Sequence, residues 1–188
     1  MCLRGALFLS LVWGLACEPI AAPATEGTPG PTSARVEAGD RLPEFLLRDQ
    51  AGNTVTPATL LGTVSTLTFA VPGAAQPGPF LSRIDDVYDR LGADAIRVGR
   101  YLVTLPGPGD GSSPVERAGW QSLRGDPEAV ADLAARFGVV TWPGPDGDTV
   151  QTLGAAVIGP SGVVAGRFGG LETWEEMDLL VAITQAGR

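Results

Sequence analysis

The chain has 188 residues and a net charge of −8, which disfavours nucleic acid as a partner because nucleic-acid-binding surfaces are strongly basic. All 13 basic residues are arginines, so the chain has no lysine and no histidine, the side chains behind most acid–base and metal chemistry. The two cysteines, Cys2 and Cys17, precede the predicted domain, so that domain cannot build a disulfide, a thiolate metal site or a cysteine nucleophile.

Residues 1–17 have the layout of a secretory signal, in which Arg4 is followed by an apolar run and then by small residues. The run is too short to span a membrane. Two cleavage patterns remain open. Residues 14–16 before Cys17 resemble a bacterial lipobox, whereas Ala22, Pro23 and Ala24 fit cleavage after Ala24. We favour lipidation at Cys17, which predicts an exported lipoprotein anchored on the periplasmic or cell-envelope side. The alternative is a soluble periplasmic protein.

Residues 18–34 contain several prolines and show no hydrophobic periodicity, which predicts an extended linker. The folded domain is expected over residues 35–188. Its first part, residues 42–57, alternates apolar and polar positions on either side of Gly52 and Asn53 and predicts a β-hairpin. A short helical turn is expected over residues 58–62.

Residues 64–71 are β-branched and apolar enough to form a central strand covered on both faces. The next segment predicts an amphipathic helix, because its apolar residues recur at helical spacing. These residues are Phe80, Leu81, Ile84, Val87, Tyr88 and Leu91. A second strand is expected over residues 95–105, and a strand, helix, strand order implies a right-handed parallel crossover.

The second half of the domain predicts two further helices and a hairpin. A capping-box pattern at Ser113 and Glu116 predicts a short helix, and Asp126 begins a longer one. Residues 153–168 predict an antiparallel hairpin. A terminal helix is expected after a capping box formed by Thr173 and Glu176. Its inward residues would be Trp174, Met177, Leu180, Val181 and Thr184. This order predicts an α/β, thioredoxin-like fold: a central mixed sheet flanked by helices, with an N-terminal β-hairpin extension.

Several segments in sequence order carry a family resemblance. They read "GDRLPEFLLRDQAGNTVTPATLLG", "LTFAVPG", "LRGDPEAVADLAARFGV", "WPGPDGDTVQT" and "VIGPSGVVAGRFG". Over residues 39–185 the chain resembles the Sco/SenC family, thioredoxin-fold copper proteins that help to assemble the CuA centre of cytochrome c oxidase. The stretch "FAVPGAAQP" also resembles the loop of atypical peroxiredoxins. In that alignment the peroxidatic cysteine falls on Pro79 and its activating threonine on Gln76, so peroxide chemistry is not expected.

The Sco resemblance implies a copper site made of two cysteines and a histidine. Those three positions fall on Ala74, Gly78 and Gln151. Alanine and glycine carry no donor atom, and an amide oxygen is a poor ligand for soft Cu(I). We therefore expect a degenerate member of the family that binds no copper and has no other cofactor.

What remains of the site is predicted to be a surface for a partner protein. Trp142 is the residue of most interest there, because tryptophan is favoured at binding hot spots. Trp120 and Trp174 could line a groove, but packing in the core or at its rim is the simpler interpretation. Asp146 and Asp148 could instead form a weak Ca²⁺ site, against a plain acidic loop. The predicted partner surface consists of Pro72, Gln76, Pro79, Trp142, Asp146, Asp148 and Gln151.

The resulting hypothesis is an exported, membrane-tethered, non-catalytic binding or assembly factor linked to respiratory oxidase or copper-protein maturation. Its partner would be the oxidase or one of its assembly factors, and it would not be an enzyme. Two alternatives remain. One is a redox or metal-binding protein that uses unrecognised residues such as Gln76, Asp146, Asp148 and Gln151. The other is an inert envelope lipoprotein in which only the fold matters.

Overall fold

The computed structural model describes residues 34–74, 77–107, 115–144, 149–169 and 174–188. The predicted signal, Cys17 and nearly all of the predicted linker lie outside these ranges and stay predictions. Among the described residues, no helix is both long and apolar enough to cross a membrane.

The domain is built on a five-stranded mixed sheet with the order β5-β4-β3-β8-β9. Strand β3 lies at its centre, parallel to β4 and antiparallel to β8, and all seven of its residues are buried. The strands are β3 (Val64–Ala70), β4 (Val98–Thr104), β5 (Gln121–Leu123), β8 (Gly154–Ile158) and β9 (Val164–Gly169). This arrangement confirms the predicted central strand, parallel crossover and C-terminal hairpin.

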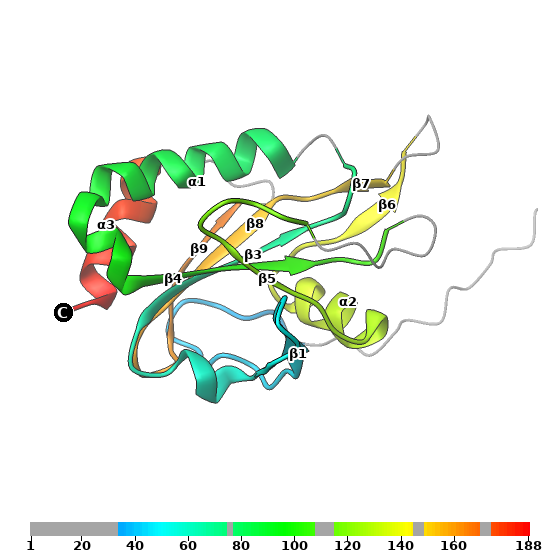
Figure 1. Cartoon of the computed structure of the whole chain (residues 1–188), viewed down its shortest axis with the longest axis horizontal. Helices are drawn as coiled ribbons and strands as arrows, with labels where there is room; N and C mark the ends of the chain where they lie inside the picture. Colours follow the sequence, from blue (N-terminus) through cyan, green and yellow to red (C-terminus); the bar gives the residue numbers. More distant parts are fainter. Residues whose placement is uncertain (1–33, 75–76, 108–114, 145–148, 170–173) are drawn as a thin grey trace, which may run out of the picture. The chain divides into compact units, whose positions relative to one another are not determined.

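Helices cover both faces of the sheet (Figure 1). Residues of β3 contribute to two separate apolar cores, one on each face. One face packs against α1 (Pro77–Leu91) and α3 (Glu176–Ala186). The other packs against α2 (Pro127–Arg136) and the N-terminal segment. That segment holds β1 (Leu47–Arg48), β2 (Thr54–Val55) and the 3₁₀ helix η1 (Pro57–Leu60). The predicted N-terminal hairpin is therefore confirmed, with short strands.

The helix predictions hold where one apolar face is well defined. In α1 the predicted inward residues are buried except Leu91, which is half-buried. Helix α2 begins after Asp126, whose carboxylate accepts hydrogen bonds from the backbone N–H groups of Glu128 and Ala129. The strand expected from residue 95 begins instead at Val98, because residues Gly92–Arg97 form the 3₁₀ helix η2.

Two predictions about helices are wrong. No helix forms in the described residues 115–119, which make a turn leading into β5. In α3 the cap is Glu175, paired with Asp178, and Thr173 lies outside the described residues.

The predicted inward face of α3 is only partly right. Trp174 and Leu180 are half-buried and pack against the core, but Met177, Val181 and Thr184 are exposed. The buried residues of the helix are Leu179 and Ile183. Apolar side chains occur on several sides of this helix, so their spacing does not single out one face.

Candidate functional site

The loop that would carry the metal ligands leaves the carboxyl end of β3. Pro72 and Gly73 form its turn, with Gly73 at φ +75°, and the N–H of Ala74 donates to the carbonyl oxygen of Val71 at 3.3 Å. A positive φ favours glycine, which explains that residue in the turn. Gln76 lies outside the described residues, and the chain is described again from Pro77, where α1 begins.

Next to this loop lies a short hairpin that the sequence did not predict. Its strands are β6 (Thr141–Pro143) and β7 (Thr149–Gln151), which pair antiparallel (Figure 1). The hairpin is fixed at its base by Thr152. The Oγ1 of Thr152 accepts from the N–H of Val140 at 2.9 Å and donates to the carbonyl oxygen of Gly138 at 3.0 Å.

Gln151 is the residue that joins the hairpin to the loop. Its side chain is 3% exposed. Its Oε1 accepts a hydrogen bond from the N–H of Val71 at 2.5 Å, and its Nε2 donates to the carbonyl oxygen of Phe69 at 3.0 Å. The amide thus continues the hydrogen bonding of β3 where the sheet ends, and both of its polar atoms are bound to backbone.

The other two positions aligned with family ligands offer no polar side-chain atom. Ala74 is partly buried and packs against the core on the α2 face. Gly78 lies in the first turn of α1, where its carbonyl oxygen accepts from Ser82 Oγ at 3.1 Å. A Cβ added at Gly78 would meet no atom of the described residues within 4 Å.

These three residues do not fit a copper ion. Two of them have no donor, and the amide of the third is buried and bound to the backbone of β3. Elsewhere in the described ranges, no group of three or more histidine, cysteine, aspartate or glutamate side chains is placed to hold a metal. Asp146 and Asp148, the alternative Ca²⁺ candidates, lie outside those ranges.

The structure brings together only part of the predicted partner surface. Gln151 contacts the strand end that precedes Pro72, and Pro79 is exposed in the first turn of α1. Trp142 is 45% exposed on β6, where it pairs with Val150. Val140, also exposed, was not predicted as part of the surface.

Trp120 and Trp174 pack within the domain, in agreement with the simpler interpretation. Trp120 is buried against Tyr88, and its Nε1 donates to an Asp85 carboxylate oxygen at 2.8 Å. Trp174 packs edge-on against Phe80 and Phe168 and lies under the Arg83 guanidinium, 4.3 Å from its ring centre. These packed rings hold α1 and the segment before α3 on the sheet.

Arg83 and Asp85 also bind charged groups on neighbouring segments. Arg83 Nε donates to a Glu176 carboxylate oxygen at 2.8 Å, and this hydrogen bond lowers the pKa of Glu176. Arg117 Nε donates to Asp85 at 2.7 Å. No local pattern in the sequence indicates these partners, which are 93 and 32 residues away.

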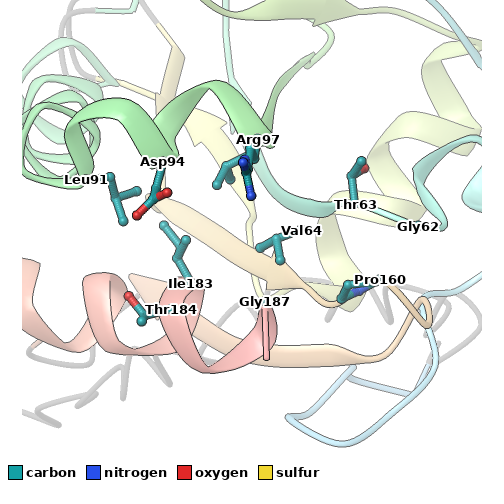
Figure 2. A pocket seen from close by; sticks show the side chains of 11 residues that line it. Gly62, Thr63, Val64, Leu91, Asp94, Arg97, Pro160, Ile183, Thr184 and Gly187 are labelled. Carbon is teal, nitrogen blue, oxygen red and sulfur yellow. The ribbon is translucent and has the colours of Figure 1, made fainter.

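A cavity of about 520 Å³ lies at the opposite end of β3 (Figure 2). It is bounded by the start of β3, η2 and the last turn of α3. Its lining includes Thr63, Val64, Asp94, Arg97, Ile183 and Thr184. Of the predicted site, none of the residues that the structure describes lines this cavity.

No protein-family model matches the chain, and no curated protein matches it. Solved structures do match. Copper-bound ScoI of Bradyrhizobium japonicum is 22% identical, with a TM-score of 0.58, over 78% of this chain and 98% of that one. A SCO1/SenC family lipoprotein of Bacillus anthracis is 14% identical, with a TM-score of 0.62, over 82% and 99%.

A solved structure of another kind of protein is also similar in fold. A putative thiol:disulfide interchange protein DsbE of Chlorobium tepidum is 18% identical, with a TM-score of 0.56, over 80% of this chain and 98% of that one. The chain is therefore a thioredoxin-fold domain similar in fold to structures of Sco proteins and of DsbE.

Proposed function

We propose that this chain is a degenerate relative of the Sco proteins that acts by binding a partner protein rather than by carrying copper or electrons. One observation carries the proposal. At the position where the resemblance places a metal-binding histidine, Gln151 is buried and both polar atoms of its amide bind the backbone of β3. A side chain bound in this way holds the surface in shape and leaves no site for a soft metal.

The exposed side chains beside Gln151 support a binding role. Trp142 and Val140 are 45% and 50% exposed, although apolar side chains of this size are more often buried. Tryptophan is enriched among the residues that dominate binding energy at protein interfaces. We place the partner among proteins of the respiratory oxidase or of its assembly, as the Sco resemblance implies, and the chain on the cell-envelope side, tethered through lipidated Cys17.

The test is photo-crosslinking of the full chain in its native membranes. A photo-crosslinking amino acid replaces Trp142 in one variant and Val181 in the control variant. Val181 is similarly exposed, at 43%, but lies on α3. We expect crosslinks to oxidase subunits or assembly factors from position 142 only. Equal crosslinking from both positions would contradict the proposed surface. No crosslinking from position 142 would contradict the proposal and favour an inert envelope protein.

A copper titration tests the loss of the metal site separately. The full chain carries Cys2→Ser and Cys17→Ser, so that no thiol outside the domain can take the metal. We expect no stoichiometric Cu(I) binding under reducing conditions. Tight binding of one Cu(I) per chain would refute this part of the proposal and favour a metal carrier that uses unrecognised residues.

A further inference from the structure

Strand β6 has an exposed edge. Among the described residues it pairs only with β7, and the four consecutive residues 140–143 are all exposed. The edge strands of the main sheet are different. Strand β5 is followed at Arg124 by a bridge to Arg48, and the start of β9 is covered at Val164 by the backbone of Asp40. Natural sheets usually cover or charge such edges, and residues 140–143 carry no charge.

The register of the hairpin shows which backbone groups of β6 point outward. The N–H of Thr152 donates to the carbonyl oxygen of Val140 at 2.9 Å, so these two residues form a hydrogen-bonded pair. Such pairs alternate along an antiparallel ladder, which makes Trp142 and Val150 the next one. The N–H and C=O of Thr141 and the C=O of Pro143 therefore point away from β7.

Pro143 agrees with this direction. Proline has no N–H to donate and is tolerated in strands where the missing group would face outward. Pro143 pairs with Thr149 at such a position. The outer edge of β6 thus offers one donor and two acceptors at strand spacing, flanked by the side chains of Val140 and Trp142.

We propose that β6 binds an extended segment of a partner protein by strand addition. The segment would pair with Thr141 and Pro143 through its backbone, and its alternate apolar side chains would pack on Val140 and Trp142. Because the chain carries a net charge of −8, the segment is neutral or basic. This inference rests on the proposed function and states how the partner is held.

The probe is a phage-displayed library of random linear nonapeptides, selected against the full chain in detergent. Enriched peptides should carry apolar residues at alternate positions. They should bind Thr141→Val as tightly as the unaltered chain and bind Thr141→Pro about tenfold more weakly, since proline removes the outward donor. The pairing of β6 with β7 does not use the N–H of Thr141, so the Thr141→Pro hairpin should persist.

Hydrogen exchange on the unaltered chain gives a readout that does not depend on any variant folding. A bound peptide should protect the amide of Thr141 from exchange. Strand addition would be overturned by peptides that bind Thr141→Pro as tightly as the unaltered chain, or by peptides that leave the amide of Thr141 unprotected. A selection that enriches no peptide would also overturn it. A dimer of the chain that Thr141→Pro abolishes would also overturn it, because a second copy would then occupy the edge.

The crosslinking assay separates this inference from the function on which it rests. If Thr141→Pro keeps the crosslinks formed from position 142 in native membranes, partner binding stands and strand addition fails. If position 142 forms no specific crosslink in either chain, the proposed function itself fails.

Discussion

The two ends of strand β3 differ in whether the space beside them is closed. One end is closed by hydrogen bonds, and the other borders a cavity. At the carboxyl end, the Gln151 amide binds the N–H of Val71 and the carbonyl oxygen of Phe69 and closes the sheet. At the amino end, a cavity of about 520 Å³ opens beside Val64, with exposed charges at Asp94 and Arg97. The end that the resemblance associates with chemistry is the closed one. A position that aligns with a family ligand can therefore hold a polar residue for a structural reason.

The largest expected effect comes from rebuilding the ligand set at the closed end. The variant Ala74→Cys, Gly78→Cys, Gln151→His, made with Cys2 and Cys17 changed to Ser, should gain stoichiometric Cu(I) binding in a reducing titration. Two thiolates and an imidazole suit Cu(I), and a side chain at Gly78 has open space.

The matched control keeps Gln151 and carries only the two cysteine substitutions at positions 74 and 78. It should bind Cu(I) more weakly, because it lacks the third ligand. A triple variant that folds, as judged by circular dichroism, and binds no copper would show that the alignment of these positions is wrong.

Removing the amide alone tests whether Gln151 is structural. Gln151→Ala leaves the N–H of Val71 and the carbonyl oxygen of Phe69 buried without this partner. We expect the free energy of unfolding to fall by about 2–4 kcal/mol in urea titrations. Gln185→Ala makes the same chemical change at an exposed site on α3 and should alter it by less than about 0.5 kcal/mol. Equal effects from both substitutions would remove the structural role.

A smaller loss is expected in the middle of β3. The hydroxyl of buried Tyr88 on α1 is hydrogen-bonded to Thr66 Oγ1 at 2.5 Å. Tyr88→Phe should lower the free energy of unfolding by about 1–2 kcal/mol. Tyr101→Phe is the control, because Tyr101 is only half-buried and its hydroxyl has no hydrogen bond among the described residues. A loss from Tyr101→Phe as large as that from Tyr88→Phe would argue against this bond.

The pH dependence of the same tyrosine has a defined sign. Burial raises the pKa of Tyr88 to about 12, while the hydrogen bond with Thr66 lowers it in part. The folded state therefore prefers the neutral phenol. Its contribution to stability is complete below the unfolded pKa of about 10 and is lost as the pH rises through 12. Absorbance titration should show this late transition in the unaltered chain and not in Tyr88→Phe.

The sequence predicts those helices and strands whose hydrophobic pattern extends over enough residues to be recognised. Strand β3 is an apolar, β-branched run, and α1 shows one apolar face over four turns. Strands β5, β6 and β7 have three residues each, too few to show a period, and their pairing depends on distant partners. In α3, apolar residues lie on several sides, so the sequence does not show which side is buried. Packing against the sheet determines that Leu179 and Ile183 are the buried residues.

The candidate site is harder to predict because its key contact is remote in sequence. Gln151 and Val71 are 80 residues apart. The resemblance identifies position 151 as important, but it cannot show that an amide there binds the backbone of β3. The β-branched Thr149 and Val150 before it are the only local signal for a strand. A glutamine after β-branched residues, next to an apolar strand, is a pattern to examine for such an amide contact.

The smallest expected effect lies in the N-terminal hairpin, away from both ends of β3. The carboxylate of Asp49 accepts from the N–H of Asn53 at 2.8 Å, from Asn53 Nδ2 at 2.9 Å and from Gln121 Nε2 at 3.1 Å. The side-chain hydrogen bond from Asn53 is the main cause that lowers the pKa of Asp49.

A lowered pKa means that the ionised group stabilises the fold above the unfolded pKa of about 3.9, and that this stabilisation is lost as the pH falls through the folded pKa. Asp49→Asn should therefore be less stable than the unaltered chain at pH 7 and approach it as the pH falls through the lowered pKa of Asp49, in urea titrations at a series of pH values. A difference that stays constant from neutral to acidic pH would show that Asp49 acts through the shape of its hydrogen bonds and not through its charge.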